Sequence, residues 1–156
     1  MKKIGIIYHP LNKSAPSLAK KLADFLGTRG VYTWLCSAWE EKQAREQVTG
    51  SDLILTIGGD GTILRAAQAV APHSIPITGV NLGKLGFMTE LPADAAIDKL
   101  SALLDGEGWI DERAMLEAEF ASGDGQKNKR FLALNDVVIA RGEIARIIYV
   151  EAEING

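Results

Sequence analysis

The sequence predicts an α/β fold: an open, mostly parallel sheet with helices on both faces, followed by the beginning of a β-rich second domain. Two observations predict it. Apolar runs of strand length alternate with helical patterns over the first hundred residues, which is typical of a parallel sheet covered on both faces. Beyond Gly108 the pattern changes to the alternation of half-buried strands. We therefore place an α/β domain at residues 1–105 and an incomplete β-rich domain at residues 106–156.

Strand and helix patterns follow one another in order along the first domain. The clearest helix has Leu18, Leu22 and Leu26 at helical spacing, with Gly30 just past its end. Predicted strands cover residues 3–8, 31–36, 52–57 and 77–80. Predicted helices cover residues 17–29, 39–48, 62–71 and 92–104. A helix after each strand returns the chain to the edge where the next parallel strand begins.

The second domain consists of three strand patterns, over residues 109–120, 130–140 and 145–154. Asp124-Gly125 and Arg141-Gly142 lie between them, and such turns between strand runs indicate hairpins. Three strands make a poor independent sheet, so we expect this domain to be truncated and the chain to associate. The apolar side chains expected at the surface are those of Val137, Ile139, Ile147 and Val150.

Composition excludes several classes of partner. The net charge is −3 at pH 7, and no basic block occurs, which argues against nucleic acid or an anionic membrane surface as the main partner. No stretch approaches the ~20 apolar residues of a membrane span. The single cysteine, Cys36, lies in an apolar run and has no second cysteine to pair with. We expect it to be buried and the protein to be cytoplasmic.

The most informative motif is the glycine-rich turn Gly58-Gly59-Asp60-Gly61-Thr62, between an apolar strand and a helical pattern. Glycines let a ligand approach bare backbone, and the beginning of a helix directs free N–H groups toward a phosphate. Asp60 is an unusual anion for that place unless it handles a proton, a hydroxyl or a metal. The alternative is a tight turn in which Asp60 only caps the helix.

A second glycine-rich loop follows the fourth strand. It begins near Asn81 and has glycines at positions 79, 83 and 86, so we expect it to lie close to another backbone or a ligand. Asn81 either bridges loops and contacts a ligand or only tolerates a left-handed backbone. Phe87 is expected in the core.

The pair Asn135-Asp136 interrupts an apolar strand pattern, and buried polar groups need partners. Asn135 has both a donor and an acceptor, which suits an adenine edge, whereas Asp136 has only acceptors, which suits ribose hydroxyls. The alternative is a bulge or the polar start of a strand.

Together these motifs resemble the NAD kinase family. The matching segments are residues 58–62 with Leu64-Arg65, residues 81–87, residues 113–116 and residues 135–138. They occur in the family's order and at about its spacing, over essentially the whole chain. The glycine turn is shared with diacylglycerol-type lipid kinases and 6-phosphofructokinases, but the other segments point to NAD kinase. The family's later glycine-, serine- and threonine-rich segment, which completes its NAD site, is missing.

The resemblance implies transfer of the terminal phosphoryl of ATP, or of polyphosphate, to the 2′-hydroxyl of the adenosine ribose of NAD, which gives NADP. Asp60 matches the family's catalytic proton acceptor. The residues implied to contact NAD are Asp60, Gly61, Arg65, Asn135, Asp136 and Arg146. The phosphate loop would consist of Gly58, Gly59, Gly61 and Thr62. Asn81 is a further candidate, and Mg²⁺ or another divalent cation is expected, with ligands that the sequence does not assign.

Two other functions compete with this one. The first is a lipid kinase that shares the glycine turn, although no basic amphipathic membrane element is present. The second is a non-catalytic nucleotide-binding or assembly fragment, which the early end of the sequence favours. We expect the complete protein to be a homo-oligomer, a dimer or a tetramer, and this chain alone to be inactive.

Overall fold

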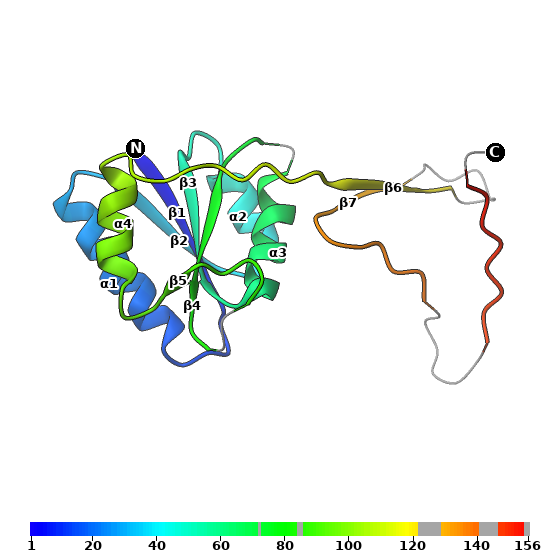
Figure 1. Ribbon diagram of the computed structural model, residues 1–156, viewed down its shortest axis with the longest axis horizontal. Coiled ribbons are helices and arrows are strands. Elements are labelled where there is room, and N and C mark those ends of the chain that lie inside the picture. Colours follow the sequence, from blue (N-terminus) through cyan, green and yellow to red (C-terminus); the bar gives the residue numbers. More distant parts are fainter. Residues whose placement is uncertain (72, 84–85, 122–128, 141–146, 155–156) are drawn as a thin grey trace.

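The computed structural model describes residues 1–71, 73–83, 86–121, 129–140 and 147–154. The main body of this part is a parallel sheet between helices (Figure 1). Its strands are β1 (Lys3–Tyr8), β2 (Tyr32–Ser37), β3 (Leu53–Gly58), β4 (Ile77–Asn81) and β5 (Leu91–Pro92). Its helices are α1 (Ala15–Thr28), α2 (Glu41–Gln47), α3 (Asp60–Val70) and α4 (Ala96–Leu104). The predicted fold class, an open parallel sheet with helices, is confirmed.

The sheet has the strand order β2-β1-β3-β4-β5, and every pair in it is parallel. The chain first moves outward from β1 to β2 and then crosses back to β3 on the other side of β1. Connections therefore leave β1 and β3 in opposite directions. In open α/β sheets the carboxyl ends of two such strands border a crevice in which ligands bind.

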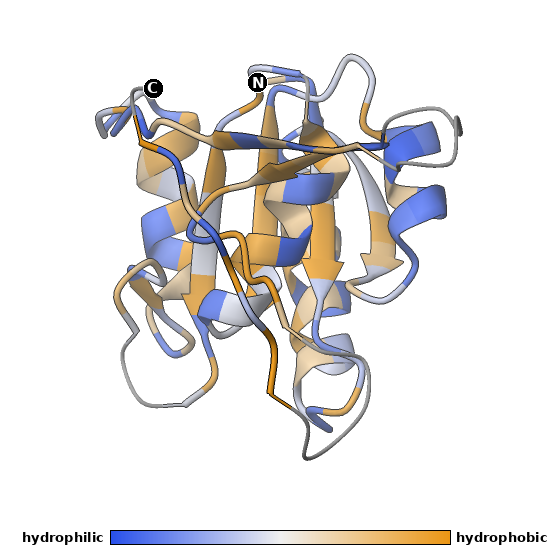
Figure 2. Cartoon of the chain, turned by 90° about the vertical axis from the view of Figure 1, so that its right-hand side faces the viewer, coloured by the Kyte–Doolittle hydropathy of each residue, from blue (hydrophilic) through white to orange (hydrophobic). Residues whose placement is uncertain are grey.

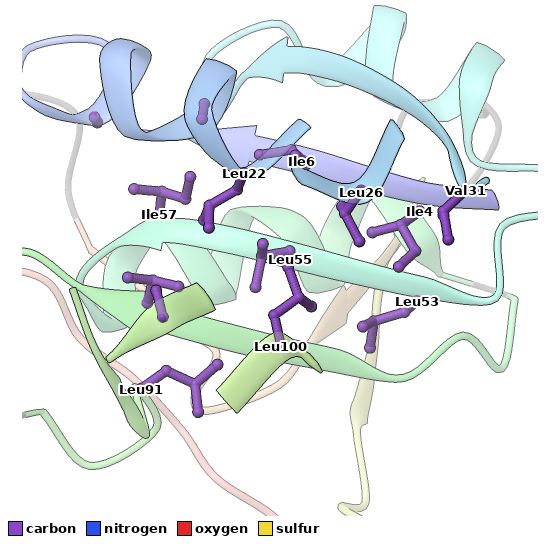
Figure 3. Packing of buried hydrophobic residues seen from close by; sticks show 14 residues of the cluster. Ile4, Ile6, Leu22, Leu26, Val31, Leu53, Leu55, Ile57, Leu91 and Leu100 are labelled. Carbon is purple, nitrogen blue, oxygen red and sulfur yellow. The ribbon is translucent and has the colours of Figure 1, made fainter. Parts of the chain in front are cut away.

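The helices cover both faces of the sheet. Leu53 and Leu55 of β3 belong to the cluster that packs under α1 and α4 (Figure 3), whereas Ile54 belongs to the cluster under α2 and α3. This alternation follows from the strand geometry, since successive side chains point to opposite faces. Figure 2 shows the strands inside the body as mainly hydrophobic and the outer helix surfaces as partly hydrophilic. The helices therefore exclude water from both faces of β1 and β3, which lie inside the sheet.

Most element boundaries shift from the prediction by one or two residues, and two of the differences affect the site. The helix predicted over residues 92–104 begins only at Ala96, because Leu91 and Pro92 pair with β4 as the edge strand β5. A proline is tolerated there since an edge strand needs fewer donors. The helix predicted to begin at Thr62 begins at Asp60. Asp60 is therefore part of the first helical turn.

The C-terminal part extends away from the body (Figure 1) and contains an antiparallel hairpin of β6 (Leu116–Phe120) and β7 (Lys129–Ala133). The prediction of a hairpin is confirmed, but the predicted strands of residues 109–120 and 130–140 were too long. Residues 147–154 form no strand, although a strand was predicted over 145–154. An alternating pattern becomes a strand only where another strand accepts and donates its hydrogen bonds. The two predicted turns, at residues 124–125 and 141–142, lie outside the described residues.

The apolar side chains of the C-terminal segment are exposed, as predicted. The exposed fractions are 46% for Val137, 73% for Ile139, 80% for Ile147 and 60% for Val150. In Figure 2 this segment crosses in front of the body and is hydrophobic over part of its length. Apolar side chains that gather on a surface are typical of places where another surface binds. The association of the chain stays a prediction.

Cys36 is buried, as expected. Burial, with the nearby Glu40 carboxylate, raises the pKa of its thiol to about 11, so the thiol stays protonated at neutral pH and behaves as a small apolar side chain. Among the described residues, none of the helices combines the length and the apolar character needed to cross a membrane.

Candidate functional site

The candidate site lies where the loops after β1, β3 and β4 meet. The His9 N–H donates to the Ile57 carbonyl (2.9 Å), and the Leu82 N–H donates to the Gly58 carbonyl (3.0 Å). Asn81, at the end of β4, is the register partner of Gly58. The parallel pairing thus brings together two motifs that are about 20 residues apart in the sequence, because the carboxyl ends of neighbouring parallel strands share one edge.

Two hollows adjoin this edge. The first, of about 470 Å³, lies at the crevice between β1 and β3; it is lined by His9, Leu11, Asn12, Gly58, Gly59, Asn81, Leu82 and Gly83. The second, of about 890 Å³, lies toward the beginning of α1; it is lined by Ser14, Ser17, Leu18, Lys21, Asn81, Leu82, Gly83, Pro92, Ala93 and Asp94. The hollows share the loop of residues 81–83. The smaller one is lined by the first two glycines of the turn, Gly58 and Gly59, and it lies where the crevice rule for open sheets predicts.

The glycines of the turn differ in what the fold requires of them. A Cβ on Gly58 would overlap the hydroxyl oxygen of Thr62, so the fold itself needs glycine there. A Cβ on Gly59 or Gly61 would meet no atom within 4 Å. Gly59 has an extended backbone (φ −128°) that any residue adopts. Neither packing nor backbone conformation therefore explains why residue 59 is a glycine, and packing does not explain why residue 61 is one.

The beginning of α3 is open to solvent at these glycines. Gly59 precedes the helix, no side chain caps it, and both Gly59 and Gly61 are exposed. The Thr62 N–H donates to the Gly59 carbonyl (2.8 Å), and the Thr62 hydroxyl is buried without a hydrogen-bond partner among the described residues. The turn therefore presents backbone rather than the Thr62 hydroxyl to its surroundings.

The Asp60 carboxylate is bound by the loop of residues 86–89. Its Oδ2 accepts the Phe87 N–H (2.8 Å), and its Oδ1 accepts the N–H groups of Met88 (3.1 Å) and Thr89 (3.2 Å). The Thr89 hydroxyl lies 3.4 Å from Oδ1 and donates to it. Asp60 lines neither hollow. The alternative interpretation, in which Asp60 only caps the helix, is wrong: α3 has no side-chain cap, and Asp60 instead binds the second glycine-rich loop.

These contacts set the charge of Asp60. The Phe87 N–H, followed by those of Met88 and Thr89, lowers the pKa of the carboxyl below its ordinary value of 3.8 and outweighs the opposite effect of burial. Hydrogen bonds to the ionised form stabilise that form. Asp60 is therefore an anion at neutral pH and a weak base.

Close packing against Asp60 requires Gly86. A Cβ at this position would overlap the Asp60 carboxylate, which confirms the expectation that the second loop presses on another segment. Phe87 was expected in the core, and this was wrong: its side chain is 99% exposed. Its N–H donates to Asp60 while its ring points into solvent, because the loop turns its backbone N–H groups toward the carboxylate.

The other predicted residues are more scattered. Asn81 is buried, and its Oδ1 accepts the Gly83 N–H (2.8 Å), so it shapes the loop between the hollows. Arg65 is exposed on α3, four residues after Gly61 and so on the same helical face.

Asn135 and Asp136 are exposed and joined by a hydrogen bond from Asn135 Nδ2 to Asp136 Oδ1 (3.1 Å). They line neither hollow. They follow β7, which approaches α3. The prediction of Arg146 as a contact of NAD lies outside the described residues.

The described residues provide no protein cage for a metal ion, since among them no three His, Cys, Asp or Glu side chains gather. A magnesium ion is commonly held by one or two carboxylates together with substrate phosphates.

The sequence analysis missed three polar residues of the site. His9 and Asn12 line the smaller hollow, and Thr89 binds Asp60. His9 and Asn12 could have been predicted as site residues, because polar residues just after the first strand of a parallel sheet lie at the edge where ligands bind. Thr89 follows the second glycine-rich loop without any local pattern that marks it.

Comparisons with known proteins agree with this geometry. Residues 29–108, just over half of the chain, match the family model of the ATP-NAD kinase N-terminal domain. A protein of Dehalococcoides mccartyi named NAD kinase is 53% identical over 99% of this chain and 54% of its own length. A Chloroflexus aurantiacus protein of the same name is 38% identical over 99% of this chain and 56% of its own length. The chain thus spans about half the length of these relatives.

Solved structures show the same fold. A crystal structure of yeast NADH kinase complexed with NADH has a TM-score of 0.69 at 20% identity and covers 86% of this chain and 47% of its own. An NAD kinase from Archaeoglobus fulgidus in complex with ATP has a TM-score of 0.51 at 22% identity and covers 75% of this chain and 40% of its own. From the family model and the sequence relatives, the chain belongs to the NAD kinase family.

Proposed function

We propose that this chain carries the catalytic aspartate and the phosphate-binding turn of a cytoplasmic NAD kinase, which transfers the terminal phosphoryl of ATP to the 2′-hydroxyl of the adenosine ribose of NAD. Family membership supports the reaction, and the crevice at the ends of β1 and β3 supports the place. The relatives are named NAD kinase, which favours this reaction over lipid phosphorylation.

The observation that carries the proposal is the pair of glycines at positions 59 and 61. At both positions a Cβ would meet no atom of the described residues within 4 Å, and both residues are exposed at the beginning of α3. Glycine within a helix costs about 0.5–1 kcal/mol relative to alanine, so its presence at 61 needs a reason outside the fold. A phosphate chain that lies against bare backbone, near the free N–H groups of a helix, supplies that reason.

Asp60 then serves the ribose hydroxyl. Its carboxylate is an anion at neutral pH, so it accepts a hydrogen bond from the 2′-hydroxyl and receives the proton as the phosphoryl group moves. Phosphoryl transfer depends mainly on positioning and on neutralising charge. Mg²⁺ or another divalent cation would neutralise charge on the ATP phosphates, since magnesium is commonly held by one or two carboxylates together with substrate phosphates.

On the NAD side we propose contacts from Gly61, Arg65, Asn135, Asp136 and Arg146. Arg65 shares a helical face with Gly61, which supports a contact between its side chain and the ligand. Asn135 and Asp136 are exposed and offer their remaining donors and acceptors to a ligand. The exposed apolar residues of the C-terminal segment support assembly into a dimer or tetramer.

The test is NAD phosphorylation by this chain and by a completed chain, in which the unmatched part of the Dehalococcoides mccartyi relative is joined to it. We expect the completed chain to form NADP from NAD and ATP and the given chain alone to be inactive. In the completed chain, Asp60→Asn should lower turnover by at least about a hundredfold, as for the loss of a general base. Gly61→Ala should lower turnover while the melting temperature stays the same or rises.

Gly27→Ala is the matched control for Gly61→Ala. Gly27 lies in α1, and a Cβ there also meets no atom of the described residues within 4 Å, but it is far from the turn in sequence. This variant should keep full turnover. Wild-type turnover in Gly61→Ala would contradict the phosphate loop. Binding of nucleotide without turnover in the completed chain would favour the non-catalytic alternative, and turnover with diacylglycerol instead of NAD would favour the lipid kinase.

A further inference from the structure

The donors around Asp60 are divided unevenly between its two oxygens. Oδ1 receives the N–H groups of Met88 and Thr89 and the Thr89 hydroxyl, whereas from the described residues Oδ2 receives only the Phe87 N–H. Each carboxylate oxygen has about two acceptor positions. Oδ1 is therefore saturated by the protein, and Oδ2 keeps one position.

Thr89 is held so that its hydroxyl cannot turn away from Asp60. Its side chain is buried, with 2% exposed. The hydroxyl accepts the Gly86 N–H (3.3 Å) and donates to Asp60 Oδ1. The methyl group lies against Gly79 of β4, where an added Cβ would come within 3.1 Å of it. A β-branched side chain fixed on both branches has a single rotamer, so β4 determines the direction in which the hydroxyl points.

We propose that Thr89 is a positioning residue for Asp60: with the backbone of residues 87–89 it immobilises Oδ1, so that Oδ2 is the oxygen that meets the ribose hydroxyl. The inference rests on the proposed function and extends it to a residue that does not touch substrate. Without the Thr89 hydroxyl, the carboxylate keeps three of its four hydrogen bonds and its orientation about the last bond is held less firmly. A misplacement of about 1 Å is enough to cost up to ~10²-fold in rate.

The charge of Asp60 provides a readout that a merely structural role of Thr89 would not change. Ionisable side chains on the elements packed against α3 are Lys3 and Tyr8 of β1, Glu41, Lys42, Arg45 and Glu46 of α2, and Lys129 and Arg130 of β7. None of them is a leading cause of the lowered pKa of Asp60; the Phe87 N–H is the first, and the Thr89 hydroxyl contributes as well. Loss of that hydroxyl therefore raises the pKa of Asp60 toward its ordinary value.

Two substitutions separate the hydroxyl of Thr89 from its methyl group. Thr89→Val keeps a branched side chain against Gly79 and removes the donor, whereas Thr89→Ser keeps the donor and removes the methyl group. In the completed chain we expect Thr89→Val to lower kcat on the order of tenfold, as for a weak hydrogen bond to a charged group. The KM for ATP should stay unchanged, and the acid limb of the pH–rate profile should move upward. Thr89→Ser should keep most of the wild-type kcat and the wild-type acid limb.

The same substitutions are measured in the given chain by NMR titration of the Asp60 carboxyl carbon, which needs no turnover. The Asp60 pKa should rise in Thr89→Val and stay low in Thr89→Ser. A wild-type kcat and pKa in Thr89→Val overturn the inference, as does an equal loss of kcat in both variants. If the completed wild-type chain does not phosphorylate NAD, the proposed function fails instead. The role of Thr89 in holding Asp60 is then tested by the titration alone, and an unchanged Asp60 pKa in Thr89→Val overturns it.

Discussion

Gly86→Ala tests whether the second glycine-rich loop is built around Asp60. A Cβ at position 86 would overlap the Asp60 carboxylate, and the neighbouring N–H groups of Phe87 and Met88 are bound to the same carboxylate. The Asp60 carboxylate could move away from the added methyl group only by breaking those hydrogen bonds. The loop must therefore move away from α3, or the carboxylate must rotate out of its contacts.

The expected cost follows from overpacking at one site. Inserting a methyl group into a packed position costs typically 1–3 kcal/mol, and we expect about 2 kcal/mol here because water replaces part of the lost hydrogen bonding at this partly exposed group. For a chain of this size, each kcal/mol corresponds to roughly 2–4 °C in Tm. Gly86→Ala should therefore lower the Tm by about 4–8 °C.

The assay is thermal unfolding followed by circular dichroism, together with hydrogen exchange of the amides of residues 87–89. These amides should lose protection in Gly86→Ala, because their acceptor is displaced. Gly27→Ala, which adds the same methyl group inside α1 without meeting any atom, should keep or raise the Tm. A Gly86→Ala protein with wild-type Tm and wild-type exchange at these amides would refute the argument that the loop is closed on Asp60.

The remaining predictions concern the pH dependence of stability and the NAD contacts. The N–H groups of Lys2 and Lys3 lower the pKa of Asp52, and the N–H groups of the 87–89 loop lower that of Asp60. Because both pKa values are lower in the folded state, their stabilisation is fully present above the ordinary value of 3.8 and is lost as the pH falls through the lower folded values. Melting curves recorded from about pH 2 to about pH 7 should show this loss of stability. Asp52→Asn should make the loss smaller. A Tm that does not change with pH below the ordinary aspartate pKa would contradict the prediction. Asn135→Ala and Asp136→Ala should each weaken NAD binding to the completed chain by roughly 1–3 kcal/mol in calorimetric titration, with the exposed Asp98→Ala of α4 as control, and unchanged affinity in both variants would remove the pair from the site.

The sequence alone determined the architecture of the first domain. Strands such as β1 and β3 are apolar on both faces, and the helix α1 has a regular apolar stripe. These patterns are local, and each reports which faces of its own element are buried. The place of the glycine turn, between β3 and α3, followed from the same local pattern. The carboxyl ends of parallel strands share one edge, so the meeting of Gly58 and Asn81 was also within reach of the sequence.

Only the tertiary structure decided what surrounds Asp60. Its partners, Phe87 to Thr89, come almost thirty residues later, and no local pattern records which donors meet a carboxylate across that distance. The exposure of Phe87 has the same cause, since the loop directs its backbone toward Asp60. The strand β5 and the shortened strands β6 and β7 likewise depended on whether another strand was present to pair with. Periodicity shows which side of an element avoids water, but hydrogen-bond partners distant in the sequence are fixed only when the chain has folded.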